Sequence, residues 1–209
     1  MMAQKRQNQG CRTDQSTNGR KKTRRRGSGL EDAIFQATWD ELADVGYARL
    51  TMEGIADRAR TGKAAVYRRW SNRAELVLAA IRKQGPLMGE EVPNTGELRE
   101  DLLVLLSRFA RRLQEIGAET INGLFTEYVG HISVNESTRV REKSAKAIMT
   151  ILYKAAERGE IEIDKITPRI ATLPNDLVRH ELLINREPIS NRAIVEIVDD
   201  IFLPLITHP

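Results

Sequence analysis

The amino-acid sequence predicts an all-α protein, and three observations lead to this prediction. Hydrophobic residues make up 41% of the 209 residues, whereas aromatic residues make up only 5%. Long stretches of the chain contain neither Gly nor Pro. Within those stretches the apolar residues recur at the spacings that place them on one face of a helix.

The first predicted helix runs from about Leu30 to Val45, and Gly46 ends it. Its apolar residues lie along one side, as a helix packed against a core requires. A glycine suits the position after a helix because it adopts positive φ at little cost. We expect this helix to support the two that follow, with Trp39 and Tyr47 contributing to packing rather than to recognition.

Two short helices follow, joined by a tight corner. Thr51 is placed to cap the first of them, whose apolar residues share one face. The second begins near Gly62, with Val66 and Trp70 facing inward and basic residues facing outward. A corner of a few residues holds the second helix across the first and leaves it exposed. This arrangement is a helix-turn-helix, and it points to duplex DNA.

The charge of this segment supports a nucleic-acid partner. Between Tyr47 and Arg73 the chain has seven basic residues and only two acidic ones, Glu53 and Asp57, for a net charge of +5. Binding to the phosphates of a duplex requires such a concentration of positive charge.

The N-terminal segment is also strongly basic. Residues 1–28 hold nine Lys and Arg against one acid, a net charge of +8, while the other 181 residues hold 24 basic and 28 acidic, a net charge of −4. The segment has few large apolar residues, so we expect it to be disordered when free. One interpretation is a DNA-binding arm that follows the phosphates or enters a minor groove. The other is a solvated tail that adds only nonspecific attraction. The basic residues next to the first helix are Arg20, Lys21, Lys22, Arg24, Arg25 and Arg26.

Several spaced positions around the helix-turn-helix resemble those of a known family. They are Gly46, Tyr47, Leu50, Thr51, Ile55, Ala56, Ala59, Lys63, Val66, Tyr67, Arg68, Arg69, Trp70, Glu75 and Leu76. Over about residues 30–81 the chain is similar to the DNA-binding domain of TetR-family transcriptional regulators. The resemblance implies a three-helix DNA-binding domain at 29–84 and a helical ligand-binding and dimerisation domain at 85–209, which leaves the basic arm predicted from charge at 1–28. One position departs from the family, which usually has glycine at the corner where this chain has Arg60.

The resemblance also implies which residues contact DNA. Groove contacts fall on the start of the recognition helix, at Thr61, Gly62, Lys63, Ala64 and Ala65. An ammonium such as that of Lys63 donates to guanine O6 or N7, and an alanine methyl contacts a thymine methyl. We expect phosphate contacts from Thr51, Tyr67, Arg68, Arg69 and Arg73. The alternative for each arginine is a solvated surface charge, which we favour for Arg58.

A series of longer helices is predicted after the helix-turn-helix. The first runs from about Asn72 through Lys83 and ends at Gly85-Pro86. A strong apolar stripe begins at Leu98, and further helices are expected at about 119–132, 137–158, 168–184 and 191–206. Gly159 marks the expected end of the helix at 137–158. Pro174 should bend or restart the helix that contains it.

The last two predicted helices carry more apolar surface than one buried face needs. In the resembled family such a pair forms a four-helix bundle with its twofold mate, which implies a homodimer. Its two recognition helices would lie about 34 to 36 Å apart and would read a palindromic DNA operator. The alternative is burial within one chain. The proposed interface residues are Leu177, Ile184, Ile194, Val198, Ile201 and Phe202.

The resemblance implies a second step, in which a small molecule binds the C-terminal domain and alters the spacing of the DNA-binding domains. The effect requires different affinities for two shapes of the protein. Candidate ligand-binding residues are Phe109, Phe125, Tyr128 and His131. Each also suits a plain core position, and nothing in the residues names the ligand. The most direct expectation is a repressor that its ligand releases from DNA; the alternative is a ligand-independent or architectural DNA-binding protein.

The sequence argues against an enzyme. The three histidines are far apart without metal-ligand spacing, the one cysteine lies in the polar N-terminal segment, and no glycine-rich phosphate loop is present. We therefore assign no catalytic residue, metal or cofactor. No run approaches the roughly 20 apolar residues that span a bilayer, so we expect no membrane partner and a cytoplasmic location.

Overall fold

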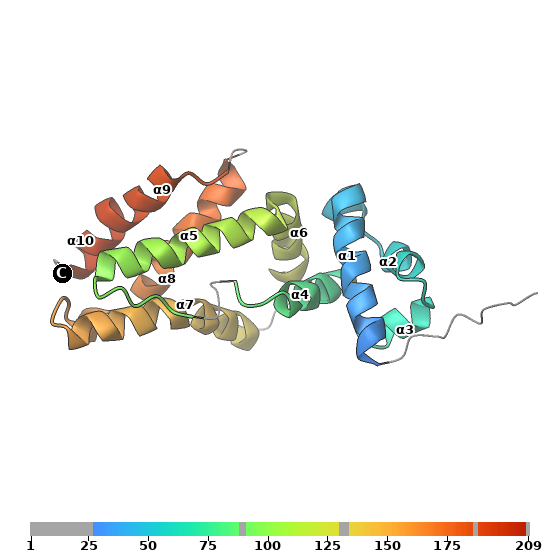
Figure 1. The fold of residues 1–209 in the computed structure, drawn as a ribbon, viewed down its shortest axis with the longest axis horizontal. Helices are drawn as coiled ribbons and strands as arrows, with labels where there is room; N and C mark the ends of the chain where they lie inside the picture. The colour runs from blue at the N-terminus through green and yellow to red at the C-terminus, as the bar shows by residue number, and fades with distance from the viewer. Residues whose placement is uncertain (1–26, 88–90, 130–133, 186–187, 208–209) are drawn as a thin grey trace, which may run out of the picture.

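The computed structural model describes residues 27–87, 91–129, 134–185 and 188–207, with the backbone alone at 128–129 and 134–144. All regular structure in these ranges is helical, which confirms the predicted fold class. The molecule is elongated (Figure 1): helices α1 to α4 lie toward one end, and the later helices extend away from them. We call the first group the head and the second the body.

The head consists of α1 (Ser28–Arg49), α2 (Met52–Arg58), α3 (Lys63–Tyr67) and α4 (Arg73–Lys83). Gly46 interrupts the helical backbone of α1 with a φ of 73°, at the position where the sequence predicts the helix end. Thr51 caps α2, because its side chain accepts a hydrogen bond from the N–H of Gly54. Asn72 caps α4 in the same way. The predicted helix-turn-helix and the helix after it are thus present.

The core of the head joins all four helices. Ile34, Ile55, Val66 and Leu76 come one from each helix, and all are completely buried. Trp70, which follows α3, packs its ring at 5.3 Å from the ring of Phe35. Helix α1 contacts both α2 and α4, as expected of a supporting helix.

The body consists of α5 (Leu98–Ile116), α6 (Ala118–Val129), α7 (Val134–Glu157), α8 (Pro168–Ile184), α9 (Asn191–Glu196), a π-helical turn (Ile197–Phe202) and α10 (Leu203–Thr207), with a short 3-10 turn at Ile163–Lys165. Helix α5 contacts α6, α7, α8 and α9, so it is the centre of the body. Its predicted apolar stripe is buried, including Leu102, Leu105 and Phe109. Helix α6 also contacts α1 and α4 and therefore connects the body to the head.

The structure refines two predictions about the body. The predicted effect of Pro174 was a bend or a restart, and the restart does not occur, because α8 continues from Pro168 to Ile184 with Pro174 inside it. The last predicted helix is composite, because a π-helical turn separates α9 from α10. A π turn widens the backbone by one residue per turn and shifts the side chains that follow it, which periodicity alone does not reveal.

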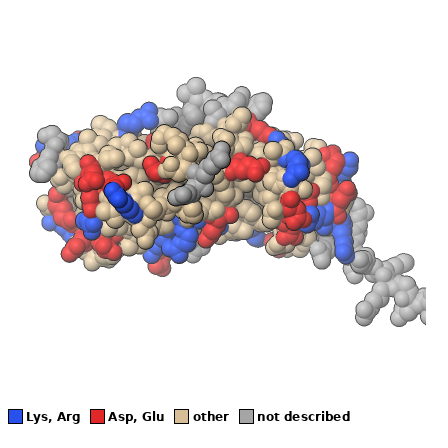
Figure 2. Space-filling view, turned by 90° about the horizontal axis from the view of Figure 1, so that it is seen from above, with Lys and Arg blue, Asp and Glu red and all other residues tan. Residues whose placement is uncertain are grey.

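The surface is charged without one dominant sign. On the face in Figure 2, acidic and basic side chains are interspersed along the molecule. Among the described residues, none of the helices combines the length and the apolar character needed to cross a membrane.

Candidate nucleic-acid interface

The corner between α2 and α3 is a closed turn in which Arg60 has a φ of 54°. The N–H of Thr61 donates to the carbonyl of Ala56 at 3.0 Å, and the N–H of Arg60 donates to the carbonyl of Asp57 at 3.0 Å. This pair of bonds is the Schellman arrangement, in which the residue directly after the C-cap has a left-handed backbone; the C-cap of α2 is Ala59, so that residue is Arg60. Glycine is usual at this position. Arg60 has a Cβ, so its left-handed backbone conformation is sterically unfavourable.

Helix α3 lies with one face in the core and the other toward solvent. Val66 is completely buried, whereas Lys63, Ala64, Tyr67 and Arg68 are exposed. Of the other predicted groove residues, Gly62 is exposed, and Thr61 and Ala65 are half-buried. The predicted recognition residues therefore share one accessible face of the head.

The basic residues around α3 differ in how they are held. Arg58 forms ion pairs with Glu41 and Asp44 and so joins α2 to α1. It is predicted as a surface charge rather than a DNA contact, and the structure gives that charge a structural role in the head. Arg69 donates to the carbonyl of Ala65 at 2.9 Å. Arg68 makes no side-chain hydrogen bond or ion pair with any residue that the structure describes.

Lys63 and Tyr67 share one acidic partner. The ammonium of Lys63 lies 3.7 Å from Oε1 of Glu53, and the hydroxyl of Tyr67 donates to the same oxygen at 3.3 Å. Desolvation of the Tyr67 hydroxyl raises its pKa, and the charge of Glu53 and the hydrogen bond to it add to the effect. Glu53 comes from α2, and it therefore connects the two helices of the helix-turn-helix on the exposed side.

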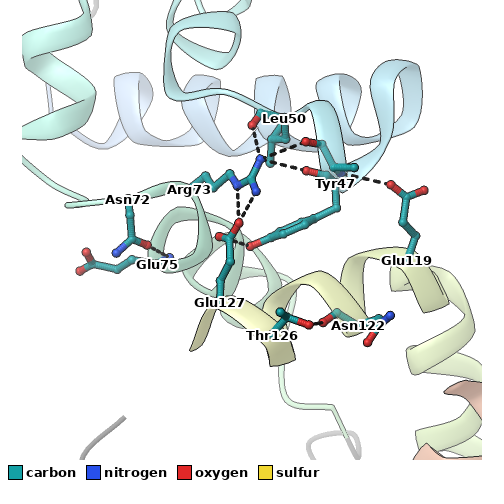
Figure 3. A network of polar contacts seen from close by, with 10 residues as sticks. Tyr47, Leu50, Asn72, Arg73, Glu75, Glu119, Asn122, Thr126 and Glu127 are labelled. Carbon is teal, nitrogen blue, oxygen red and sulfur yellow. Dashed lines mark hydrogen bonds and ion pairs between the residues drawn. The ribbon is translucent and has the colours of Figure 1, made fainter. Parts of the chain in front are cut away.

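Arg73 is not placed as the sequence predicts. Its guanidinium points toward α6, donating to Glu127 of that helix from Nε at 2.9 Å and to the carbonyl of Leu50 at 2.8 Å (Figure 3). It also donates to the carbonyls of Tyr47 and Ala48. The hydrogen bonds to Glu127 raise the pKa of Arg73. We therefore correct its predicted phosphate contact to a role in joining the head to the body.

Tyr47 lies beside Arg73 at the same place. Its hydroxyl donates to Glu127 at 2.9 Å, and burial raises its pKa, with the hydrogen bond to Glu127 adding to the effect. The ring packs on α6 at Gly123: a Cβ on that glycine would lie 2.1 Å from Cδ1 of Tyr47. Glu119 accepts a hydrogen bond from the N–H of Ala48 at 3.2 Å. We call Tyr47, Arg73, Glu119, Gly123 and Glu127 the junction.

The sequence gives little indication of the junction. Tyr47 is correctly predicted as a packing residue, and Gly123 inside a predicted helix is the one local anomaly. Glu127 looks like an ordinary surface acid in the sequence. Its partner is 54 positions away, and no local spacing reports such a contact.

Two of the four predicted ligand-binding residues, Phe109 and Phe125, have side chains that the structure describes, and the two differ in burial. Phe109 is buried in the core, at 1% exposure. Phe125 is 47% exposed, and the guanidinium of Arg179 lies over its ring at 5.8 Å. We therefore correct Phe125 from a cavity wall to a surface aromatic. His131 and the side chain of Tyr128 lie outside the described residues, as do the six basic residues of the predicted arm.

The predicted interface residues divide into two groups. Ile194, Val198 and Phe202 are at most 3% exposed in the single chain, and Leu177 is half-buried against the core. Ile184 and Ile201 are 63% and 42% exposed. The first three side chains pack toward α5 and α8, so we correct their assignment from interface to core. Other exposed apolar residues of the same two segments are Leu183, Val195 and Leu205.

Comparison with known proteins agrees with this arrangement. The family described as "Bacterial regulatory proteins, tetR family" matches residues 34–80, and the one described as "Tetracyclin repressor-like, C-terminal domain" matches residues 92–201. The HTH-type transcriptional regulator Rv1556 of Mycobacterium tuberculosis is 36% identical over 85% of this chain and 88% of its own length. The DNA-binding transcriptional repressor TetR of Mycobacteroides abscessus is 28% identical over 87% of this chain and 96% of its own.

Solved structures show the same fold. A TetR-family transcriptional regulator from Haemophilus influenzae superimposes with a TM-score of 0.57 at 14% identity, covering 85% of this chain and 96% of its own. A TetR-like regulator from Rhodococcus sp. RHA1 gives a TM-score of 0.54 at 18% identity, covering 87% and 96%. The two family matches and the 36% identity to the mycobacterial regulator, unlike these structural likenesses, also bear on function. They show that the chain belongs to the TetR family of transcriptional regulators, which are not enzymes.

Proposed function

We propose that the protein is a sequence-specific repressor that binds a palindromic DNA operator as a homodimer and is released by a small molecule. The observation that supports DNA recognition is the exposed face of α3. Val66 faces the core, and the exposed residues of the helix and its C-cap are Lys63, Ala64, Tyr67 and Arg68. Lys63 and Ala64 suit base edges, and Tyr67 and Arg68 suit phosphates. An operator on the chromosome implies action in the cytoplasm.

The repressor assignment and the dimer have separate support. The relative from Mycobacteroides abscessus is named a repressor, and this chain aligns with nearly its whole length. Exposed apolar side chains on α8 and on the helices after it, including Ile184 and Ile201, are numerous enough to form a subunit interface. Two heads related by a twofold axis bind two half-sites of one palindrome.

The junction supports release by a ligand bound in the body. Helix α6 contacts α1 and α4 directly, and Glu127 pairs with Arg73 at the start of α4. A shift of α6 inside the body would therefore change the position of the head. The ligand needs only a higher affinity for one of the two arrangements.

The first experiment selects binding sites from a random duplex pool with the purified protein and then titrates the selected site against salt. We expect a palindrome with half-sites about one turn apart and a log affinity that falls linearly with log salt. Enrichment of no sequence, with binding that disappears as salt rises, would overturn sequence-specific regulation in favour of the architectural alternative.

A second experiment addresses the ligand. A compound that binds the folded protein raises its melting temperature, so a library screen identifies candidates. For a compound found this way, Glu127→Gln should keep the thermal shift but reduce the loss of operator affinity that the compound causes. The matched control is Glu115→Gln on α5, because the ion pair of Glu115 among the described residues is with Arg112 of the same helix. Equal responses of the two variants would contradict transmission through the junction.

A further inference from the structure

An acid, Glu53, lies beside the exposed residues of α3 that we propose to contact DNA. Its side chain is 43% exposed and comes from the first turn of α2. One oxygen, Oε1, serves both Lys63 and Tyr67, which lie four residues apart on α3. These are the α3 residues proposed for a base contact and a phosphate contact. Glu53 therefore contacts both types of DNA-binding group in the free protein.

A carboxylate in this position opposes binding to any duplex, because it adds negative charge beside the phosphates. It also affects Lys63 in a selective way. A lysine is a mobile point charge that pairs readily with a phosphate of any sequence. Its ammonium has three donors, so it can stay beside Glu53 and still donate to a base edge in the groove. A phosphate that approaches the same ammonium is repelled by the negative charge of Glu53, whereas an uncharged base edge is not.

From this geometry we infer that Glu53 is a specificity-determining residue, which keeps Lys63 directed at base edges and weakens binding to non-operator DNA. Glu53 acts through Lys63 and Tyr67, so it is a positioning residue. The inference rests on the proposed sequence-specific function. It adds the residue that sets the ratio between operator binding and nonspecific binding.

The test compares Glu53→Gln with the wild-type protein on the selected operator and on a scrambled duplex. Asp57→Asn is the matched control, because it removes the same charge from an exposed acid of the same helix. We expect Glu53→Gln to strengthen binding to the scrambled duplex by about 3- to 10-fold and to reduce the operator preference by a similar factor. Asp57→Asn should strengthen binding to both duplexes by one smaller factor and leave the preference unchanged.

The salt dependence on the scrambled duplex identifies the mechanism. Once Lys63 is released to pair with a phosphate, the slope of log affinity against log salt should steepen by about 0.9 in Glu53→Gln. This change should disappear in the double variant Glu53→Gln, Lys63→Met. Equal effects of Glu53→Gln and Asp57→Asn on both duplexes and on the slope would overturn the inference. If the wild-type protein itself prefers no sequence, it is the proposed function that fails.

Discussion

Arg60 has the backbone conformation that glycine adopts most easily. Its φ of 54° lies in the left-handed region, and its side chain is exposed. Replacing it with glycine removes the steric cost but adds freedom to the unfolded chain, and the two effects oppose each other. We expect Arg60→Gly to raise the free energy of unfolding by about 0.5 to 1 kcal/mol, measured by urea denaturation.

A second variant separates the backbone from the charge. Arg60→Ala removes the guanidinium but keeps a Cβ in the left-handed region, so it should not stabilise the protein. If Arg60→Ala stabilises as much as Arg60→Gly, the gain comes from relieving charge repulsion, and the strain argument fails.

The sequence predicts the role of a residue correctly when that role depends on its neighbours in the chain. Thr51 caps the helix that follows it, and Gly46 breaks the one before, because both effects depend on local backbone hydrogen bonds. Arg73 was predicted wrongly because it follows a helix-turn-helix in sequence but points to a helix far along the chain. A basic residue next to a DNA-binding motif serves equally well as a structural ion pair, and only the fold decides.

At the scale of elements, the contact between α1 and α6 depends on Gly123. A Cβ there would lie 2.1 Å from the Tyr47 ring, which is 3% exposed and therefore unable to move without repacking. We expect Gly123→Ala to lower the free energy of unfolding by about 1 to 3 kcal/mol, despite the better helix propensity of alanine. Chemical denaturation of the full chain measures the change.

Gly29 provides the control for this prediction. It lies in the first turn of α1, and a Cβ added there meets no atom within 4 Å. Gly29→Ala should be neutral or stabilising by up to about 1 kcal/mol. If both glycine variants behave alike, close approach of Tyr47 to α6 is not what restricts position 123.

A second link between elements should make stability depend on pH. Arg99 of α5 donates two hydrogen bonds of 2.8 Å to Asp199 in the π-helical turn. These bonds lower the pKa of Asp199 below its ordinary value of 3.8. A carboxyl whose pKa is lower in the folded state stabilises the protein above the unfolded-state pKa, and this stabilisation is lost as pH falls through the folded-state pKa.

The measurement compares the unfolding free energy of wild type and Asp199→Asn in steps from about pH 6 to about pH 3. The difference should be largest at the upper end and shrink below pH 3.8. In an Arg99→Met background, Asp199→Asn should lose this pH-dependent difference. A difference that persists unchanged to the lowest pH would show that Asp199 stabilises the turn without its charge.

Helices were easier to predict than the surfaces between them. The stripe from Leu98 to Leu113 has strong periodicity, so α5 was evident. Periodicity reports that one face is apolar, but not what covers that face. Phe109 and Phe125 both suited a cavity, yet the first is in the core and the second on the surface. The same limit explains why Val198 and Phe202 were assigned to the interface.

At the scale of the whole molecule, the proposed dimer requires an apolar surface that the single chain leaves exposed. Ile201 is 42% exposed in the π-helical turn, whereas its neighbour Phe202 is completely buried. A charge at position 202 would unfold the chain and would say nothing about assembly. A charge at position 201 is tolerated in the monomer but must be desolvated in a dimer, which costs several kcal/mol when no partner charge is present.

We therefore expect Ile201→Asp to sediment as a folded monomer with unchanged helical circular dichroism. Tyr153→Asp on α7, where the tyrosine is 54% exposed, is the matched control and should remain a dimer. Because a dimer gains its operator affinity from binding two half-sites at once, Ile201→Asp should also bind a half-site and the full operator with similar affinity. An Ile201→Asp protein that still sediments as a dimer would place the interface elsewhere on the body.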